Sequence, residues 1–191
     1  MAHAPAPRAE AVELRPPPSR ELRQPPTVAV PIAVAVAALA FVRYPSGAEA
    51  LVAAFTAGIL VILAAIDLVH RVIPNRIVLP AFGLVLVTQL AFYPQHAVEW
   101  LVCALAAALA LLIPHMIRSA WMGMGDVKLM LLIGAALGWQ VAGALLLAYL
   151  CVFPVAVVLL IRGGRVAGKR TIPFGPFLAL GALIMLFTSH V

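Results

Sequence analysis

Two aspartates have the clearest capacity for chemistry in this 191-residue chain. Asp67 lies near the end of an apolar run, in the stretch AAIDLVHRVIPN, and Asp126 lies near the start of another, in GMGDVKLM. An ionisable group at the edge of a membrane segment is costly and therefore indicates a functional site. Two carboxyl groups that converge can hold one proton between them and polarise a water molecule, which is the chemistry of hydrolysis.

The sequence predicts unlike surroundings for the two aspartates. Asp67 is expected at a helix C-terminus, where the helix dipole disfavours a carboxylate, and Asp126 near an N-terminus, where the dipole stabilises one. Gly123 and Gly125 permit a turn and the close approach of another chain. The plainest alternative is that Asp67 merely ends its helix and that Asp126 is an ordinary cap. A pair of acids in unlike environments can share one proton, and the sequence leaves open which of them holds it.

The composition predicts the kind of protein that must position these acids. The chain is 64% hydrophobic and 10% charged, whereas soluble domains are about half apolar and about a quarter charged. We therefore expect a polytopic, all-α transmembrane bundle, because only helices satisfy their backbone groups within one lipid-facing segment. The net charge of +6 comes from basic residues spread over short loops. This pattern favours the lipid bilayer as partner and argues against nucleic acid.

The apolar runs divide the chain into two parts. Residues 1–26 hold seven of the sixteen prolines and four arginines, which predicts a disordered cytoplasmic tail. Residues 27–191 form the predicted transmembrane domain. Its first and fifth runs are short for a bilayer that needs about 20 residues, so six spans is an alternative to seven, and the fifth run can extend backward through Gly123. The expected spans are 27–42, 49–67, 76–93, 97–117, 126–139, 141–161 and 173–189.

Basic residues predict the orientation of these spans. With a cytoplasmic N-terminus, 12 of the 13 lysines and arginines fall on the inner side, and Arg43 is the exception. Asp67 then ends the second span and Asp126 begins the fifth at the same face of the bilayer. The hairpin between them allows the two acids to meet, although nothing in the sequence proves that they do.

Three motifs, in order, give the chain a family resemblance. They are Asp67 with Ile73-Pro74-Asn75, the Gly-x-Gly-Asp-x-Lys-Leu-Met stretch at 123–130, and Ile172-Pro173-Phe174-Gly175-Pro176-Phe177. Over roughly residues 50–187 the chain resembles the bacterial type IV prepilin peptidases, a group of membrane aspartic proteases. The resemblance implies that Asp67 and Asp126 are the catalytic pair. It also implies a multi-pass protein of the bacterial inner membrane that removes a basic leader from prepilins or pseudopilins, without a cofactor.

One departure from the larger members of that family bears on activity. Those members carry paired Cys-x-x-Cys motifs and also methylate the new N-terminus. This chain has only Cys103 and Cys151, both inside apolar runs and without a second ligand at zinc spacing. We therefore expect no metal and no methyltransferase activity. The short form resembles the peptidases of tight-adherence (Flp) pilus systems, and a pseudopilin of type II secretion is the other substrate considered.

Supporting roles follow for the remaining motif residues. Asn75 is expected to cap a helix that begins at Arg76, after Pro74 has interrupted the preceding one. Lys128 either steadies the charge of Asp126 or lies among lipid headgroups, and Gly175 and Pro176 shape a close helix approach. The oligomeric state is left open.

Two other function classes also place acids in membrane spans. One is a presenilin-like protease of other substrates, and the other is a proton-coupled transporter. Transporters usually show repeated halves with polar groups near the membrane midplane. This chain shows no repeat, and both acids lie at one edge.

Overall fold

Helices make up nearly all of the chain that the computed structural model describes, which is residues 27–45, 47–117, 123–167 and 173–188. The tail predicted for residues 1–26 and the motif residue Ile172 lie outside these ranges. The helices are α1 (Ala29–Arg43), α2 (Gly47–His70), α3 (Asn75–Phe92), η1 (Pro94–His96), α4 (Ala97–Ile117), α5 (Met124–Leu137), η2 (Gly138–Gln140), α6 (Val141–Ala167) and α7 (Gly175–Thr188). The predicted all-α class is thus confirmed.

The helix bounds differ from the predicted spans mainly at the ends. The prediction for α4 is correct at both ends, whereas α2 continues one turn beyond Asp67 to His70. α5 begins at Met124, so the fifth run extends backward through Gly125 but not through Gly123, which is the cap residue. Within the described ranges, four stretches are long and apolar enough to cross a bilayer, and α1 and α7 are shorter apolar helices. One of the four, Met124–Leu159, holds α5 and most of α6, which the turn η2 separates.

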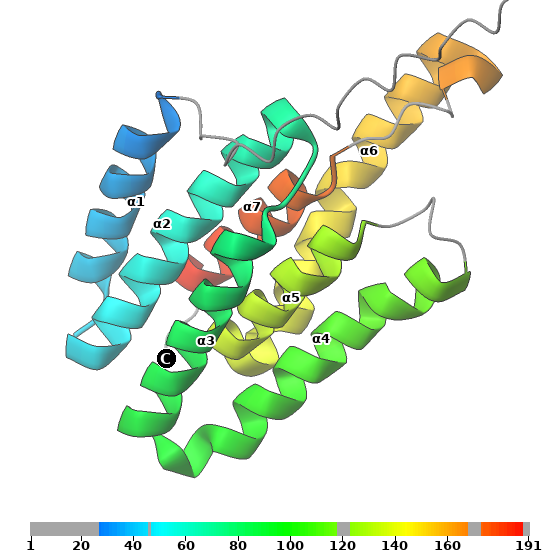
Figure 1. Cartoon of the computed structure of the whole chain (residues 1–191). Coiled ribbons are helices and arrows are strands. Elements are labelled where there is room, and N and C mark those ends of the chain that lie inside the picture. The colour runs from blue at the N-terminus through cyan, green and yellow to red at the C-terminus, as the bar shows by residue number, and fades with distance from the viewer. Residues whose placement is uncertain (1–26, 46, 118–122, 168–172, 189–191) are drawn as a thin grey trace, which may run out of the picture.

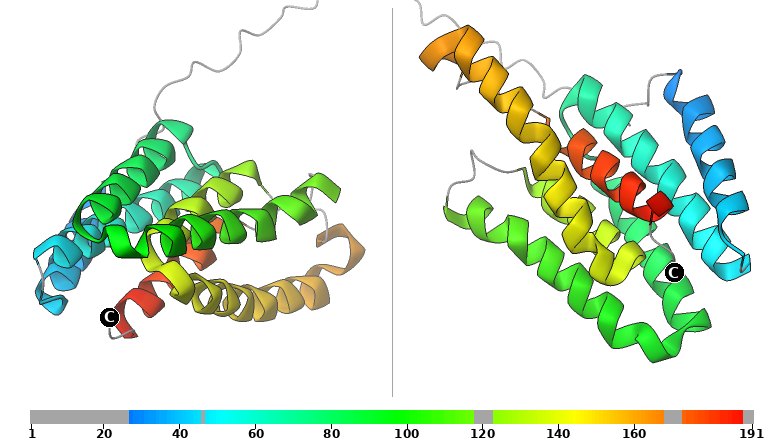
Figure 2. Two further views of the ribbon diagram at one scale, coloured as in Figure 1. Left: turned by 90° about the horizontal axis from the view of Figure 1, so that it is seen from below. Right: turned by 180° about the vertical axis from the view of Figure 1, so that it is seen from behind.

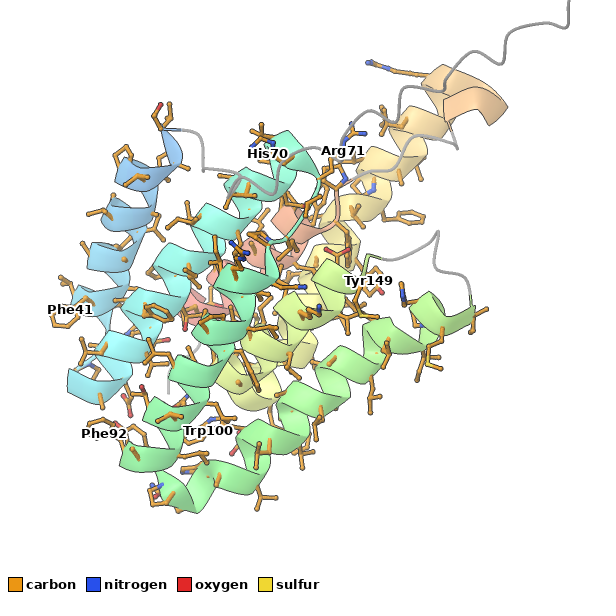
Figure 3. All side chains as sticks on the ribbon, in the orientation of Figure 1. Phe41, His70, Arg71, Phe92, Trp100 and Tyr149 are labelled. Atoms are coloured by element: carbon orange, nitrogen blue, oxygen red, sulfur yellow. The ribbon has the colours of Figure 1, made fainter. Side chains whose placement is uncertain are left out.

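Apolar side chains also cover the outside of the bundle. Phe41 and Phe92 point outward in Figure 3, and both are exposed. A soluble monomer rarely exposes large continuous apolar patches. Together with the long apolar helices, this surface is that of a membrane protein, in which lipid covers the outer side chains.

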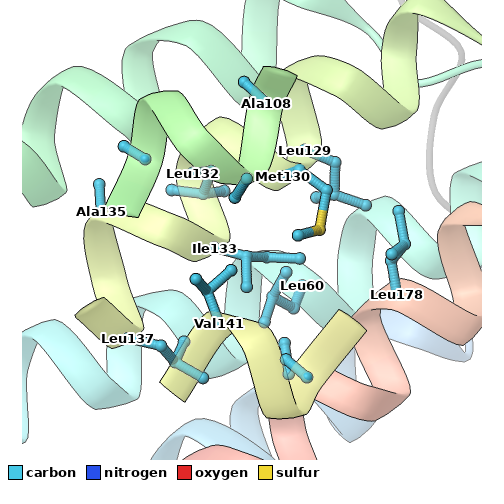
Figure 4. Packing of buried hydrophobic residues seen from close by; sticks show 14 of the residues in the cluster. Leu60, Ala108, Leu129, Met130, Leu132, Ile133, Ala135, Leu137, Val141 and Leu178 are labelled. Carbon is cyan, nitrogen blue, oxygen red and sulfur yellow. The ribbon is translucent and has the colours of Figure 1, made fainter. Parts of the chain in front are cut away.

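Helix α5 is the central element of the bundle. It packs against α3, α4 and α7, while α1 lies outside against α2, and α6 packs along α7 (Figures 1 and 2). Its side chains are buried on all sides, including Leu129, Met130, Leu132 and Ile133 (Figure 4). A helix that is apolar all round belongs in an interior. Because α5 begins with the motif that carries Asp126, the packing fixes the position of that motif.

Helices α4 and α5 approach each other closely at Gly134. A β-carbon at this position would lie 2.6 Å from the Cα atom of Ala104 and 2.7 Å from the backbone oxygen of Cys103. Small residues at such crossings allow the dispersion contacts that hold membrane helices together. Gly134 therefore sets the distance between the two helices.

The bundle has two distinct ends. Figure 3 shows His70 and Arg71 at one of them, together with the end of α2 and the start of α3. Trp100 lies toward the opposite end, where η1 connects α3 to α4. We call the first the aspartate end, because Asp67 lies in the last turn of α2.

Candidate active site

Asp67 lies in the last turn of α2 and is only 5% exposed. The backbone N–H of Arg71 donates to the backbone oxygen of Asp67 at 2.8 Å, and Arg71 has a φ of 53°. A left-handed residue just after a helix ends it and turns the chain, a position that glycine usually fills. Arg71 thus directs the chain into the segment 72–74, which returns across the end of the bundle.

Asp126 is the third residue of α5 and is 9% exposed. Its carboxyl group accepts a hydrogen bond from the backbone N–H of Gly123. This contact is one half of a capping box, in which the side chain of the third helical residue accepts from the backbone N–H of the cap residue that precedes the helix. The alternative that Asp126 is an ordinary cap is wrong, because Gly123 occupies the cap position. The contact fixes the direction of the Asp126 carboxyl group.

The two aspartates are brought together at the aspartate end. They are the only buried acidic or basic side chains within the part of the chain that the structure describes. The charge of Asp67 acts on the carboxyl group of Asp126. Buried carboxylates are rare unless they are paired or functional. The predicted convergence of the second and fifth spans is therefore realised.

Gly175, at the start of α7, lies directly against Asp67. Its backbone N–H donates a hydrogen bond to the carboxyl group of Asp67. A β-carbon at this position would lie 2.7 Å from Oδ2 of Asp67. Only glycine, which has no side chain, leaves room for the carboxyl group in its present position. Oδ2 itself is buried and has no hydrogen-bond partner among the described residues. A buried oxygen without a protein partner calls for an explanation, and a role toward a reacting group is one.

Ile73 joins the three motifs into one site. Its Cβ atom is 3.0 Å from where a β-carbon of Gly125 would be, and its Cδ1 atom is 3.2 Å from that position on Gly175. Ile73 is buried between these two glycines. Sequence reasoning quoted it as part of a motif but gave it no role. The sequence carries little signal for this role, because the neighbouring Val72 is also apolar but is 47% exposed.

Lys128 and Asn75 contact each other rather than the aspartates. The Lys128 Nζ atom donates to the Oδ1 atom of Asn75 at 2.8 Å, which links α5 to the start of α3. Neither role considered for Lys128 describes this contact. The prediction that Asn75 caps α3 is wrong, because Asn75 is the first helical residue and Pro74 occupies the cap position without a side-chain bond. Asn75 Oδ1 is directed to the lysine instead.

Two of the three motif prolines, Pro74 and Pro176, lie at helix starts. The Pro74 backbone oxygen accepts from the N–H groups of Ile77 at 3.0 Å and Val78 at 3.1 Å. Pro176 is the second residue of α7 and is partly exposed. Proline suits the first turn of a helix because its missing N–H would have no partner there. Both prolines therefore shape the backbone around the aspartates.

The described residues contain no group of three or more histidine, cysteine, aspartate or glutamate side chains that could hold a metal ion. Cys103 is buried in α4 and Cys151 is partly exposed on α6. Cys103 packs within the apolar core, as expected of a small apolar residue.

A family model described as the type IV leader peptidase family matches residues 54–161, more than half of the chain. The chain belongs to this family. The matched region contains both aspartates and ends before Gly175. The resemblance drawn from the three motifs is thus confirmed at the level of the family, and the tight-adherence form stays a prediction.

Curated relatives carry the name prepilin leader peptidase/N-methyltransferase. The protein of Stutzerimonas stutzeri is 31% identical over 134 residues, covering 66% of this chain and 46% of the relative. That of Legionella pneumophila is 35% identical over 136 residues, covering 68% and 47%. That of Bacillus subtilis (strain 168) is 26% identical over 147 residues, covering 77% and 59%. The chain thus spans about half the length of these relatives. No solved structure matches it.

Proposed function

We propose that this protein is a membrane-embedded aspartic endopeptidase that removes the leader peptide from type IV prepilins or pseudopilins. The observation that carries the proposal is the meeting of three motifs around two buried acids. Asp67 lies against Gly175, and Ile73 fills the space between Gly175 and Gly125, the residue before Asp126. The relatives named prepilin leader peptidases supply the substrate class.

In this proposal, Asp67 and Asp126 act together on one water molecule. One carboxylate takes a proton from the water while the oxygen attacks the scissile carbonyl carbon, and the other acid donates its proton to the carbonyl oxygen. The tetrahedral intermediate then breaks its C–N bond, and the amine leaves with the proton from the first acid. The second acid takes a proton back from the diol as the new carboxyl group forms. No bond forms between enzyme and substrate. The partnerless Oδ2 atom of Asp67 is a candidate partner for the water.

The place of the acids suits a bond at a membrane surface. Both lie at the aspartate end of the bundle, and the distribution of basic residues favours the cytoplasmic side for this end. A precursor with a basic leader and an apolar helix would place the bond between these two segments at the cytoplasmic surface of the membrane, where the two acids lie. The substrate class proposed is therefore the Flp-type prepilin, with pseudopilins as the second candidate.

We further propose that the protein does not methylate the new N-terminus. The chain has two cysteines, which lie on α4 and α6, and it contains no Cys-x-x-Cys motif. Mass measurement of the cleaved pilin checks this point directly. A product heavier by one methyl group, formed by the purified protein with a methyl donor, would contradict it.

Co-expression with a tagged prepilin tests the peptidase. Wild type, Asp67→Asn and Asp126→Asn are compared by gel shift, and each is checked for its amount in the membrane fraction. Loss of the leader with wild type and with neither variant supports the two-aspartate mechanism. Cleavage by Asp67→Asn would contradict the proposal that the two aspartates act as a pair. A well-inserted wild type that cleaves none of several prepilins would contradict the proposal that prepilins are the substrates.

A further inference from the structure

A cavity lies at the end of the bundle opposite the aspartates. Its volume is about 290 Å³, at the small end of ligand pockets, which measure about 300–1,000 Å³. It is lined by residues of the α1–α2 connection, α2, the end of α3, the α3–α4 connection, the start of α4, the end of α5, the turn η2 and the end of α7. None of the three family motifs contributes to it, so it is separate from the candidate active site.

One of the residues that line the cavity carries a polar group without a partner. Thr56, on α2, is fully buried, and its Oγ1 atom has no hydrogen-bond partner among the described residues. Thr88 shows the usual alternative, because its hydroxyl group donates to the Leu84 oxygen one turn earlier at 2.8 Å. Burying a hydroxyl group without a hydrogen bond is energetically unfavourable. Thr56 therefore offers an unused hydrogen-bonding group to whatever enters the cavity.

The rest of the wall combines negative charge with aromatic rings. Glu49 and Glu99, the two glutamates within the described ranges, both line the cavity, and no lysine or arginine does. A carboxylate oxygen of Glu99 lies 3.3 Å from Nδ1 of His96. The other, Oε1, lies 2.8 Å from where a β-carbon of Gly138 would be, so the carboxyl group is held between η1 and η2.

Tyr93 and Trp100 supply aromatic surface beside this carboxylate. Their rings meet edge to face with centroids 6.2 Å apart, and the His96 ring lies 5.8 Å from that of Trp100. Tyr44 is already engaged, because its hydroxyl group donates to the backbone oxygen of Leu186 at 2.7 Å. Burial raises the pKa of the Tyr44 phenol, so it remains protonated and keeps this bond.

We propose that this cavity binds a small ligand through a primary ammonium group, with Glu99 as the charge partner and Thr56 as the hydrogen-bond partner. A cation is favoured by two carboxylates and by aromatic faces. A primary ammonium group is favoured over a quaternary one, because carboxylate and hydroxyl oxygens accept N–H bonds that a quaternary group cannot donate. Two sources share this chemistry: the headgroup of phosphatidylethanolamine and a free amine such as ethanolamine. The site is independent of the proposed peptidase chemistry.

Native mass spectrometry of the full-length protein in detergent tests the proposal. The protein is offered phosphatidylethanolamine or phosphatidylcholine with the same acyl chains, and bound lipid is counted. Thermal unfolding with and without ethanolamine forms the second arm. The variants are Glu99→Gln and Thr56→Val, with Thr56→Ser to restore the hydroxyl group and Thr88→Val as the matched control outside the cavity.

Preferential retention of phosphatidylethanolamine identifies the lipid as the source, with binding at least about tenfold weaker in Glu99→Gln and Thr56→Val. Thr56→Ser and Thr88→Val should bind as wild type does. A rise in unfolding temperature with ethanolamine, lost in Glu99→Gln but without lipid preference, identifies a free amine at the same site. Equal retention of the two lipids with no effect of ethanolamine overturns the proposal, as does binding that Glu99→Gln and Thr56→Val leave unchanged.

Discussion

Gly175 lies so close to Asp67 that a β-carbon on the glycine would be 2.7 Å from the carboxylate oxygen Oδ2. The same glycine donates its backbone N–H to that carboxyl group. Helix α7 therefore begins on the aspartate, although 108 residues separate the two in the chain (175 minus 67). This contact ties the third motif to the first.

Gly175→Ala should lower peptidase activity by at least about tenfold with little loss of stability. The added methyl group cannot share the space of Oδ2, so the carboxyl group must rotate away, and a small misplacement of a reacting group is costly. The measurement is the initial rate of leader removal beside the unfolding temperature. Gly83→Ala is the matched control, because a β-carbon at position 83 meets nothing within 4 Å. Full activity in Gly175→Ala would contradict a catalytic role for the present position of Asp67.

Ile73→Ala should destabilise the protein by about 2–4 kcal/mol and reduce activity further than this loss of folded protein explains. Ile73 is 7% exposed and separates Gly125 from Gly175, so its truncation leaves a cavity between the two catalytic segments. Val72→Ala is the control from the adjacent position, where the side chain is 47% exposed. Equal effects of the two substitutions, measured by chemical unfolding and by cleavage rate, would contradict the proposal that Ile73 supports the candidate active site.

Lys128 and Asn75 should show a favourable interaction energy of about 0.5–1 kcal/mol in a double-mutant cycle. The two side chains meet at 2.8 Å but are partly open to solvent, which limits the value. The cycle uses Lys128→Ala, Asn75→Ala and the double variant, with unfolding free energies measured in one detergent. Strict additivity of the single effects would mean that the bond between α5 and α3 contributes nothing.

Arg71→Gly should raise stability by about 0.5–1 kcal/mol and leave cleavage intact. Arg71 has a φ of 53°, a conformation that costs a residue with a side chain about 1–2 kcal/mol and glycine almost nothing. The opposite is expected of Arg76→Gly, because Arg76 lies within α3, where glycine destabilises by up to about 1 kcal/mol. The pair is compared by thermal unfolding. A loss of stability in Arg71→Gly would contradict the strain inferred here.

Gly134→Ala should cost at least about 2 kcal/mol, because the added carbon meets the backbone of α4 rather than a movable side chain. Gly143→Ala is the informative control. A β-carbon there also meets an atom at 2.8 Å, but this atom is the terminal methyl group of Met185, which can move away. Similar losses in the two variants, measured by unfolding in detergent, would mean that α4 and α5 can separate without cost.

Local sequence signals were sufficient to predict the helices and to predict that the two acids lie at the same end of the bundle. The length and apolar character of the run 97–117 gave α4 at its correct ends. The spacing of apolar runs also placed Asp67 and Asp126 at the same end of the bundle, because each helix crosses it once. These features depend on composition along one segment, and a membrane restricts each such segment to a helix.

Signals at the helix ends were less reliable, because a side chain there can choose between local and distant partners. Asn75 has the chemistry of a cap, yet its oxygen accepts from Lys128 on another helix. Arg71 takes a left-handed conformation that its residue type does not favour. For Asn75, the contact with another helix outweighs a local preference of about 1 kcal/mol.

By itself, the sequence determined an all-α membrane protein with two acids at one end and three motifs that identify its family. Only the tertiary structure decided that Gly175 lies on Asp67, that Ile73 fills the space between two glycines, and that Thr56 faces a cavity at the far end. The physical reason is the range of the interactions. Burial in lipid acts on each segment alone, whereas the site depends on how side chains from α2, α5 and α7 fill a shared volume.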